Sequence, residues 1–132
     1  MKTKIFAIAT IIFTLISCIK NDNEDTTSPL LGTWELKEIL ADPGDGSGIF
    51  NTVNSNKKLT FYSNRKITSN GSICDMSVES NISSNGTYTE TNSTINSTNC
   101  QDSTIKYELT GNTLILLYPC IEGCKAKYIK VK

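Results

Sequence analysis

The sequence predicts an all-β fold, an eight-stranded antiparallel up-and-down β-barrel. The chain beyond residue 30 is rich in Asn, Ser and Thr, and short stretches of alternating apolar and polar residues lie between turn signals. A helical period of apolar residues never persists for three turns, which favours strands over helices. Eight consecutive strands joined by short connections close readily into a barrel, because closure removes the exposed strand edges.

The first five predicted strands depend on alternation and on turn residues. In the first strand Trp34, Leu36 and Glu38 are assigned to one face, and in the second strand Leu59 and Phe61 point inward. Asn and Gly residues mark the turns that follow. These five strands are predicted over residues 33–40, 58–63, 66–74, 87–91 and 94–98.

The last three strands are predicted over residues 105–109, 113–118 and 125–131. Gly111 and Asn112 separate the first two of them, and both residue types tolerate the positive φ of a tight hairpin. The strand 113–118 is apolar on both faces, so Ile115 and Leu117 are expected to point outward. They are covered by the N-terminal segment or form a docking patch.

Residues 1–17 have the pattern of an export signal. Lys2 and Lys4 precede an uncharged run over residues 5–16, and this run is shorter than the roughly 20 apolar residues that a membrane-spanning helix needs. The alternative is an ordinary secretory signal followed by an incidental cysteine. The polar, acidic residues 18–29 are expected to form a flexible tether, and residues 30–132 the single domain.

The end of this signal, Leu15-Ile16-Ser17-Cys18, resembles the lipobox of bacterial lipoproteins. The resemblance implies that Cys18 is acylated and becomes the first residue of the mature chain. Stable anchoring takes more than one acyl chain, and a multiply acylated Cys18 would stay in the membrane. Ile19 stands where retention in the inner membrane would favour Asp, so the outer membrane is the expected location, on its periplasmic or surface face.

The remaining four cysteines predict two disulfides, because a small exported domain folds in an oxidising compartment. They are Cys74, Cys100, Cys120 and Cys124, and sequence leaves three connectivities open. A metal site is the alternative, but no second close cysteine pair and no histidine is present. Asp42 and Asp45 suggest calcium, yet their spacing is wrong for an EF-hand and turn formation explains them.

Charge and residue types argue against two further classes of function. Removal of Lys2 and Lys4 with the leader changes the formal net charge from 0 to −2, which gives no electrostatic case for nucleic acid. The absence of histidine excludes the common histidine-dependent nucleophilic machinery. We therefore expect no enzyme and no cofactor.

Four segments in order resemble the small bacterial lipocalin-like lipoproteins. They are Leu31-Gly32-Thr33-Trp34, the Asp- and Gly-rich residues 42–48, Gly86-Thr87-Tyr88, and the segment from Cys120 to Cys124. The resemblance implies an eight-stranded barrel with an apolar interior and, in some members, a pocket for a small hydrophobic molecule. The chain departs from typical lipocalins in its shorter length and in lacking a clear C-terminal helix.

In such a barrel the connections that carry the four cysteines all lie at one end, which is the open mouth in lipocalins. We prefer the pairing Cys74 with Cys100 and Cys120 with Cys124, so that both disulfides stabilise this rim. The long connection 41–57 either forms a lid that lays Phe50 across the mouth, or packs on the rim without gating it. Trp34 is expected to plug the closed end.

The leading functional hypothesis is a membrane-anchored binding module for a small hydrophobic molecule. The candidate ligand contacts are Trp34, Phe50, Phe61, Tyr88, Tyr107 and Tyr118. The alternative is an interaction protein whose barrel is solid and whose rim loops dock another cell-envelope protein. Internal volume discriminates between them, because large inward side chains leave no room for a ligand.

Overall fold

The computed structural model describes residues 27–101 and 103–132. The predicted leader, the lipidation site Cys18 and most of the predicted tether lie outside these residues. Within them the prediction of an all-β fold is confirmed, since the only helical element is the single turn η1 (Thr98–Cys100). None of the described helical segments is long or apolar enough to span a membrane.

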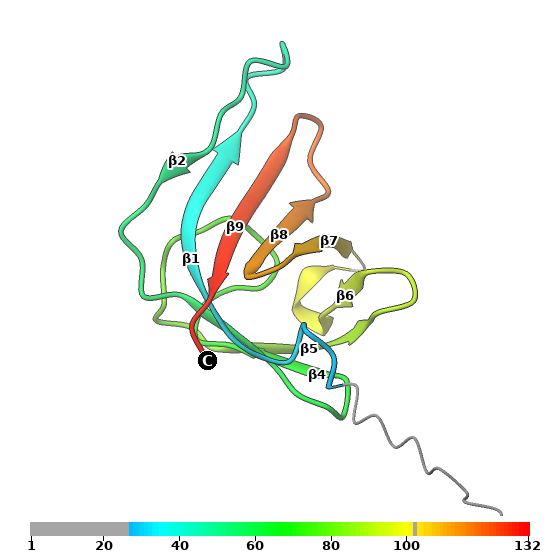
Figure 1. Cartoon of the computed structure of the whole chain (residues 1–132). Coiled ribbons are helices and arrows are strands. Elements are labelled where there is room, and N and C mark those ends of the chain that lie inside the picture. The colour runs from blue at the N-terminus through cyan, green and yellow to red at the C-terminus, as the bar shows by residue number, and fades with distance from the viewer. Residues whose placement is uncertain (1–26, 102) are drawn as a thin grey trace, which may run out of the picture.

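The strands form one antiparallel sheet that closes on itself (Figure 1). Neighbours pair in the order β2-β1-β3-β4-β5-β6-β7-β8-β9, and β1 pairs with β9 to complete an eight-stranded barrel, with β2 as an additional strand on β1. The strands are β1 (Gly32–Ala41), β2 (Asn51–Thr52), β3 (Lys58–Phe61), β4 (Lys66–Ser69), β5 (Ser84–Thr89), β6 (Thr94–Asn96), β7 (Thr104–Thr110), β8 (Thr113–Tyr118) and β9 (Cys124–Lys130).

A β-bulge in β1 corrects the face predicted for Glu38. Leu36 pairs with Tyr128, but Glu38 pairs with the next residue of β9, Lys127, so Lys37 has no partner on that strand. A bulge inserts one residue and reverses the alternation beyond it. Glu38 therefore points outward, where its carboxylate forms an ion pair with Lys127, and Ile39 packs against the core.

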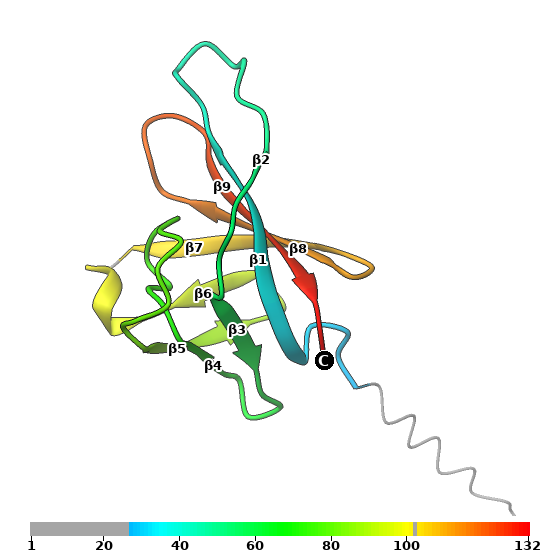
Figure 2. The ribbon, with the colours of Figure 1, turned by 90° about the vertical axis from the view of Figure 1, so that its left-hand side faces the viewer.

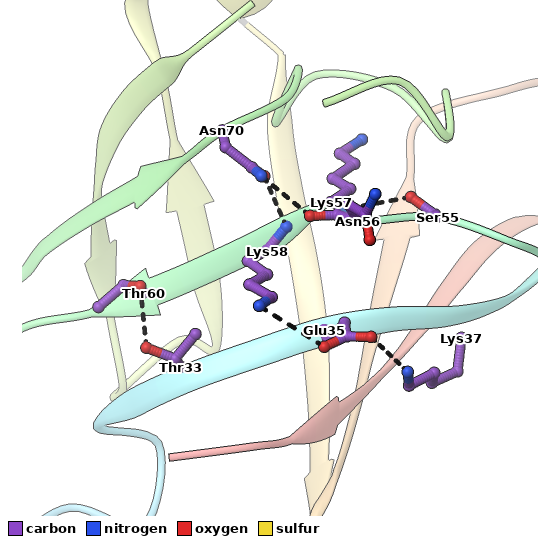
Figure 3. Close-up of polar contacts among 9 residues, drawn as sticks. All are labelled: Thr33, Glu35, Lys37, Ser55, Asn56, Lys57, Lys58, Thr60 and Asn70. Carbon is purple, nitrogen blue, oxygen red and sulfur yellow. Dashed lines mark hydrogen bonds and ion pairs between the residues drawn. The ribbon is translucent and has the colours of Figure 1, made fainter. Parts of the chain in front are cut away.

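The predicted strand 66–74 ends early, at Ser69, because the side chain of Asn70 replaces the ladder. Its Oδ1 atom accepts a hydrogen bond from the backbone N–H of Lys58, and its Nδ2 atom donates one to the carbonyl oxygen of Asn56 (Figure 3). An Asn side chain that occupies backbone groups in this way competes with strand pairing. Residues 70–83 consequently form a loop, and β5 begins at Ser84, which pairs with Ser69.

Large side chains from all eight barrel strands occupy the interior. Each of them is at most 7% exposed, and Phe61 packs edge-on against Tyr88 with their ring centroids 5.1 Å apart. Full burial of such a side chain stabilises the fold by about 1.5–3 kcal/mol. The interior residues contributed by the strands are Trp34, Leu36, Leu59, Phe61, Ile67, Tyr88, Ile95, Ile105, Tyr107, Leu114, Leu116, Ala126 and Tyr128.

One end of the barrel is closed by the residues that precede β1. Leu30 is buried, and its carbonyl oxygen accepts a 2.8 Å hydrogen bond from Nε1 of the fully buried Trp34. The backbone of Thr33 is paired with the C-terminal residue Lys132 at the same end. We call this the closed end; the first barrel strand begins here, at Gly32, after the described residues 27–31.

The opposite end carries the longer connections, and we call it the mouth end. It comprises residues 42–50, 70–83, 97–101, 103 and 119–123. Figures 1 and 2 both show the segment that follows β1 extending beyond the body of the barrel. This segment does not fold over the barrel as a lid would, which was one of the two arrangements considered for it.

Candidate functional site

Three connections at the mouth end surround an open groove of about 460 Å³. Its lining comes from the loop after β4, the connection around η1, and the turn between β8 and β9. These segments are far apart in sequence, so only closure of the barrel brings them together. The lining residues are Cys74, Asp75, Met76, Asn99, Cys100, Gln101, Ser103, Tyr118, Pro119, Cys120 and Cys124.

Both predicted disulfide bonds lie at this groove, and the preferred pairing is confirmed. Cys74 bonds to Cys100, with their Cα atoms 5.0 Å apart, and so joins the loop after β4 to η1. Cys120 bonds to Cys124, at a sequence separation of 4, and closes the turn between β8 and β9. The first bond fixes two loops to each other, and the second makes one exposed turn rigid.

The loop 70–83, not the long segment after β1, folds onto the interior at the mouth end. Its residue Ile73 is fully buried within the core cluster, and the backbone N–H of Ile73 donates a hydrogen bond to Oγ of the buried Ser84. Ser84 in turn donates from Oγ to the carbonyl oxygen of Gly71 at 2.6 Å. A β-carbon at Gly71 would lie 2.3 Å from the carbonyl oxygen of Glu79, so only glycine allows this close return of the chain.

The side chain of Lys57 binds the backbone of this loop. Its side chain is fully buried, and Nζ donates hydrogen bonds to the carbonyl oxygens of Asp75 and Ser77, at 3.1 and 2.9 Å. Figure 3 shows that Lys57 and Lys58 point to opposite sides of the strand. Burial lowers the pKa of Lys57 to about 8, against an opposing contribution from the nearby charge of Asp75.

Two phenolic hydroxyls complete a polar cluster beneath the groove. The hydroxyl oxygens of Tyr118 and Tyr128 are buried, and neither has a hydrogen-bond partner among the described residues. Burial raises the pKa of both tyrosines; next, the neighbouring Tyr128 raises the pKa of Tyr118, whereas Tyr118 lowers that of Tyr128, and the negative charge of Asp75 raises both. These hydroxyls and the Lys57 amine therefore give the mouth side of the interior a buried polar group of its own.

Phe50 lies on the outer face of the barrel wall and not across the mouth. Nζ of Lys127 is 4.1 Å from the centroid of the Phe50 ring, a distance typical of a cation–π contact. Lys127 is itself the ion-pair partner of Glu38 on the outward side of β1. Residues 41–57 therefore do not form a lid across the mouth. They correspond to the other arrangement considered, in which the segment packs on the barrel without gating its mouth.

The segment 42–48 is organised by the carboxylate of Asp42. Oδ1 accepts hydrogen bonds from the N–H groups of Gly44 and Gly46, and Oδ2 accepts one from Gly48. These three donors lower the pKa of Asp42, with Gly48 having the largest effect. A backbone hydrogen bond from Asp42 to Gly123 ties the segment to the turn between β8 and β9.

The other predicted ligand contacts are mostly core residues. Trp34 packs near the closed end, and Phe61, Tyr88 and Tyr107 form an aromatic group in which the hydroxyls of Tyr88 and Tyr107 donate to backbone carbonyl oxygens. These four residues do not line the groove. Tyr118 does, and it is the one predicted contact that the structure places at the site.

Sequence reasoning missed Lys57, Asp75 and Tyr128. The signal for Lys57 was present, because residues 57, 59 and 61 share one face of a strand and Leu59 and Phe61 were assigned inward. Asp75 gave no comparable signal, since its position depends on how the loop 70–83 folds. In the described parts of the chain, no cluster of three or more His, Cys, Asp or Glu side chains is placed to hold a metal ion.

Comparisons with protein-family models, with curated proteins and with solved structures found no significant match to this chain.

Proposed function

We propose that this protein is a membrane-tethered docking module, in which a filled barrel serves as a scaffold and the mouth-end loops bind another cell-envelope protein. The filled interior is the observation that carries the proposal. Large side chains from all eight barrel strands are at most 7% exposed, which leaves the apolar half of the barrel without room for a ligand. This favours the solid-barrel alternative over a hydrophobic pocket inside the barrel.

The mouth-end loops offer the features of a binding surface. Ile121 is fully exposed in the turn closed by Cys120–Cys124, and Ile49 is 69% exposed on the segment that packs against this turn. Exposed apolar side chains on rigid backbone lose little entropy on binding, so they make effective anchors. A disulfide-closed turn is such a backbone.

The charge of these loops indicates the chemistry of the partner. Residues 42–50 and 119–124 contain three carboxylates, Asp42, Asp45 and Glu122, and no lysine or arginine. A complementary surface would present an apolar pocket for Ile121 bordered by basic side chains. The proposed partner is therefore an envelope protein whose surface has an apolar pocket bordered by basic side chains.

The position of the loops supports the same assignment. The described chain begins at the closed end, so an anchor at Cys18 would hold that end toward the membrane. The mouth end would then face outward, where a partner can reach it.

Site-specific crosslinking tests the proposal in cells. A photoreactive amino acid at position 121 should give a discrete adduct with one envelope protein, and the same group at Tyr62, which is 46% exposed at the closed end, should not. Ile121→Asp combined with Ile49→Asp should abolish co-purification of that protein. Equal crosslinking from both positions, or undiminished co-purification, would contradict the proposal.

A small apolar molecule held at the mouth is the second candidate function. It is favoured by the groove of about 460 Å³ and by the unpartnered hydroxyls of Tyr118 and Tyr128 beneath it. Native mass spectrometry of protein purified from its own envelope separates the two. A lipid-sized mass that is lost on Tyr118→Phe would support this second function, and a stoichiometric protein would support the first.

A further inference from the structure

A regular panel of polar side chains covers the outer face of β4, β5 and the β6–η1 segment. The sequence repeats an Asn-x-Thr pattern on neighbouring strands, at Asn85-Gly86-Thr87 and at Asn96-Ser97-Thr98. Asn85 and Thr87 lie two apart on β5 and so face the same side, and Thr98, the first residue of η1, is exposed just beyond Asn96 at the end of β6. The outer panel consists of Lys66, Thr68, Asn85, Thr87, Asn96 and Thr98, all of them exposed.

The strand register aligns the panel in rows. Lys66 pairs with Thr87, and Thr87 pairs with Asn96, so these three lie side by side across three strands. Thr68 pairs with Asn85 in the second row, and Thr98 follows Asn96 by two residues. Neighbouring strands are about 4.8 Å apart, which sets the spacing within a row.

The panel lines a hollow of about 680 Å³ on the outside of the barrel. The connection around η1 borders the hollow through Thr98 and Ser103. This hollow is separate from the groove at the mouth, although Ser103 contributes to both.

The polar groups of the panel are available to a ligand. Asn96 accepts a 2.9 Å hydrogen bond at Oδ1 from Thr104, which orients the amide and leaves Nδ2 as a donor. Thr68 makes a long 3.4 Å contact with the hydroxyl of Tyr62, whose ring is 46% exposed beside the panel. Hydroxyl and amide groups both donate and accept hydrogen bonds, so the surface suits a ligand with many hydroxyls.

From this arrangement we propose that the outer panel binds a carbohydrate chain. Neutral hydroxyl and amide side chains in rows match the alternating donors and acceptors of sugar hydroxyls, and the exposed ring of Tyr62 offers an apolar face for sugar C–H groups. A single lysine gives too little charge for a polyanion such as nucleic acid. The one apolar side chain in the lining, Ile67, is fully buried beneath the panel, so it offers no exposed surface to a lipid tail. This proposal does not depend on the docking function.

An oligosaccharide array probed with the full chain in detergent tests it. The probes are maltotetraose, chitotetraose and tetragalacturonate, which cover neutral, N-acetylated and acidic sugars. We expect wild-type protein to bind at least one of them at millimolar concentration. Thr68→Val combined with Thr87→Val should weaken that binding by about tenfold, because two hydrogen-bonding hydroxyls are lost while the shape of the β-branched side chains is kept.

Matched variants decide the outcome. Thr110→Val changes an exposed threonine of β7 outside the panel and should leave binding unchanged. Ile121→Asp should also leave it unchanged, which separates this site from the mouth-end loops. Failure of all three probes to bind, or equal binding by wild type and the Thr68→Val, Thr87→Val variant, would overturn the proposal.

Discussion

Nζ of Lys57 donates a 3.1 Å hydrogen bond to the carbonyl oxygen of Asp75, from a side chain that no solvent reaches. This contact links a strand of the barrel wall to the loop that covers the mouth end. The cation is held beneath the backbone of that loop and beside the carboxylate of the same residue. The conformation of the loop 70–83 therefore depends on the hydrogen bonds of one buried amine, whose protonation changes near pH 8.

The first prediction concerns the pH dependence of stability. Lys57 has a pKa of about 8 in the folded protein and 10.5 ordinarily, so the unfolded chain binds the proton more tightly. The free energy of unfolding should therefore rise by about 1–3 kcal/mol as pH increases from 8 toward 10.5. The same gain is lost as pH falls back through 8. Urea denaturation between pH 7.5 and 9.5 should show this rise in wild type and not in Lys57→Met. Lys58→Met is the control, since Lys58 points outward, and a flat wild-type profile would contradict the prediction.

The second prediction concerns the two buried phenols. Burial raises the pKa of Tyr118 and Tyr128, so above pH 10 they ionise in the unfolded chain first, and stability falls as pH rises further. Tyr118→Phe combined with Tyr128→Phe should make that decline shallower. At pH 7 the same variant should equal or exceed wild type by about 1 kcal/mol, because unpartnered buried hydroxyls are removed. Tyr62→Phe, at an exposed position, should leave the decline unchanged, and a clear loss of stability at pH 7 in the double variant would indicate that the hydroxyls are paired.

The third prediction ranks the two disulfides. Cys74–Cys100 spans 26 residues and Cys120–Cys124 spans 4. The longer loop restricts the unfolded chain more, so Cys74→Ala with Cys100→Ala should lower the free energy of unfolding by about 3–4 kcal/mol, against about 2 kcal/mol for Cys120→Ala with Cys124→Ala. Denaturant titrations of the two variants measure the difference. The opposite ranking would show that the short bond has a structural role beyond closing its turn.

The fourth prediction concerns the tether. Cys18→Ser should move the chain from the membrane fraction to the soluble fraction and abolish incorporation of labelled fatty acid, because the acylated sulfur is lost. Cys74→Ala, which leaves Cys18 in place, should still incorporate the label. Membrane association of Cys18→Ser equal to wild type would contradict the lipoprotein assignment.

The alternation of apolar and polar residues predicted the strands well where the inward residues are apolar and the outward residues are charged. Lys106 and Glu108 separate the inward residues of β7, and the observed strand differs from the prediction by one residue at each end. The predictions were less accurate where the wall becomes irregular. Lys37 bulges and reverses the pattern of β1, and the side chain of Asn70 ends β4 five residues early.

The candidate site was only partly predictable. Counting strands placed all four domain cysteines at one end but left three connectivities open, and the structure shows the pairing that was preferred among them. Counting did not reveal which connection covers the barrel. Phe50 was a candidate for that role, yet its ring packs on Lys127 outside the wall, and Ile73 occupies the interior.

The sequence by itself determined the β architecture, the number of barrel strands and the end at which the cysteines meet, because the period of a strand and the spacing of turns are local properties. The tertiary structure alone decided that Lys57, Asp75, Tyr118 and Tyr128 share one polar cluster and that the loop 70–83 lies over it. These interactions join Lys57 to Asp75 and Asp75 to the two tyrosines, which stand on separate strands and loops, and their energies depend on burial, which exists only after the barrel has closed.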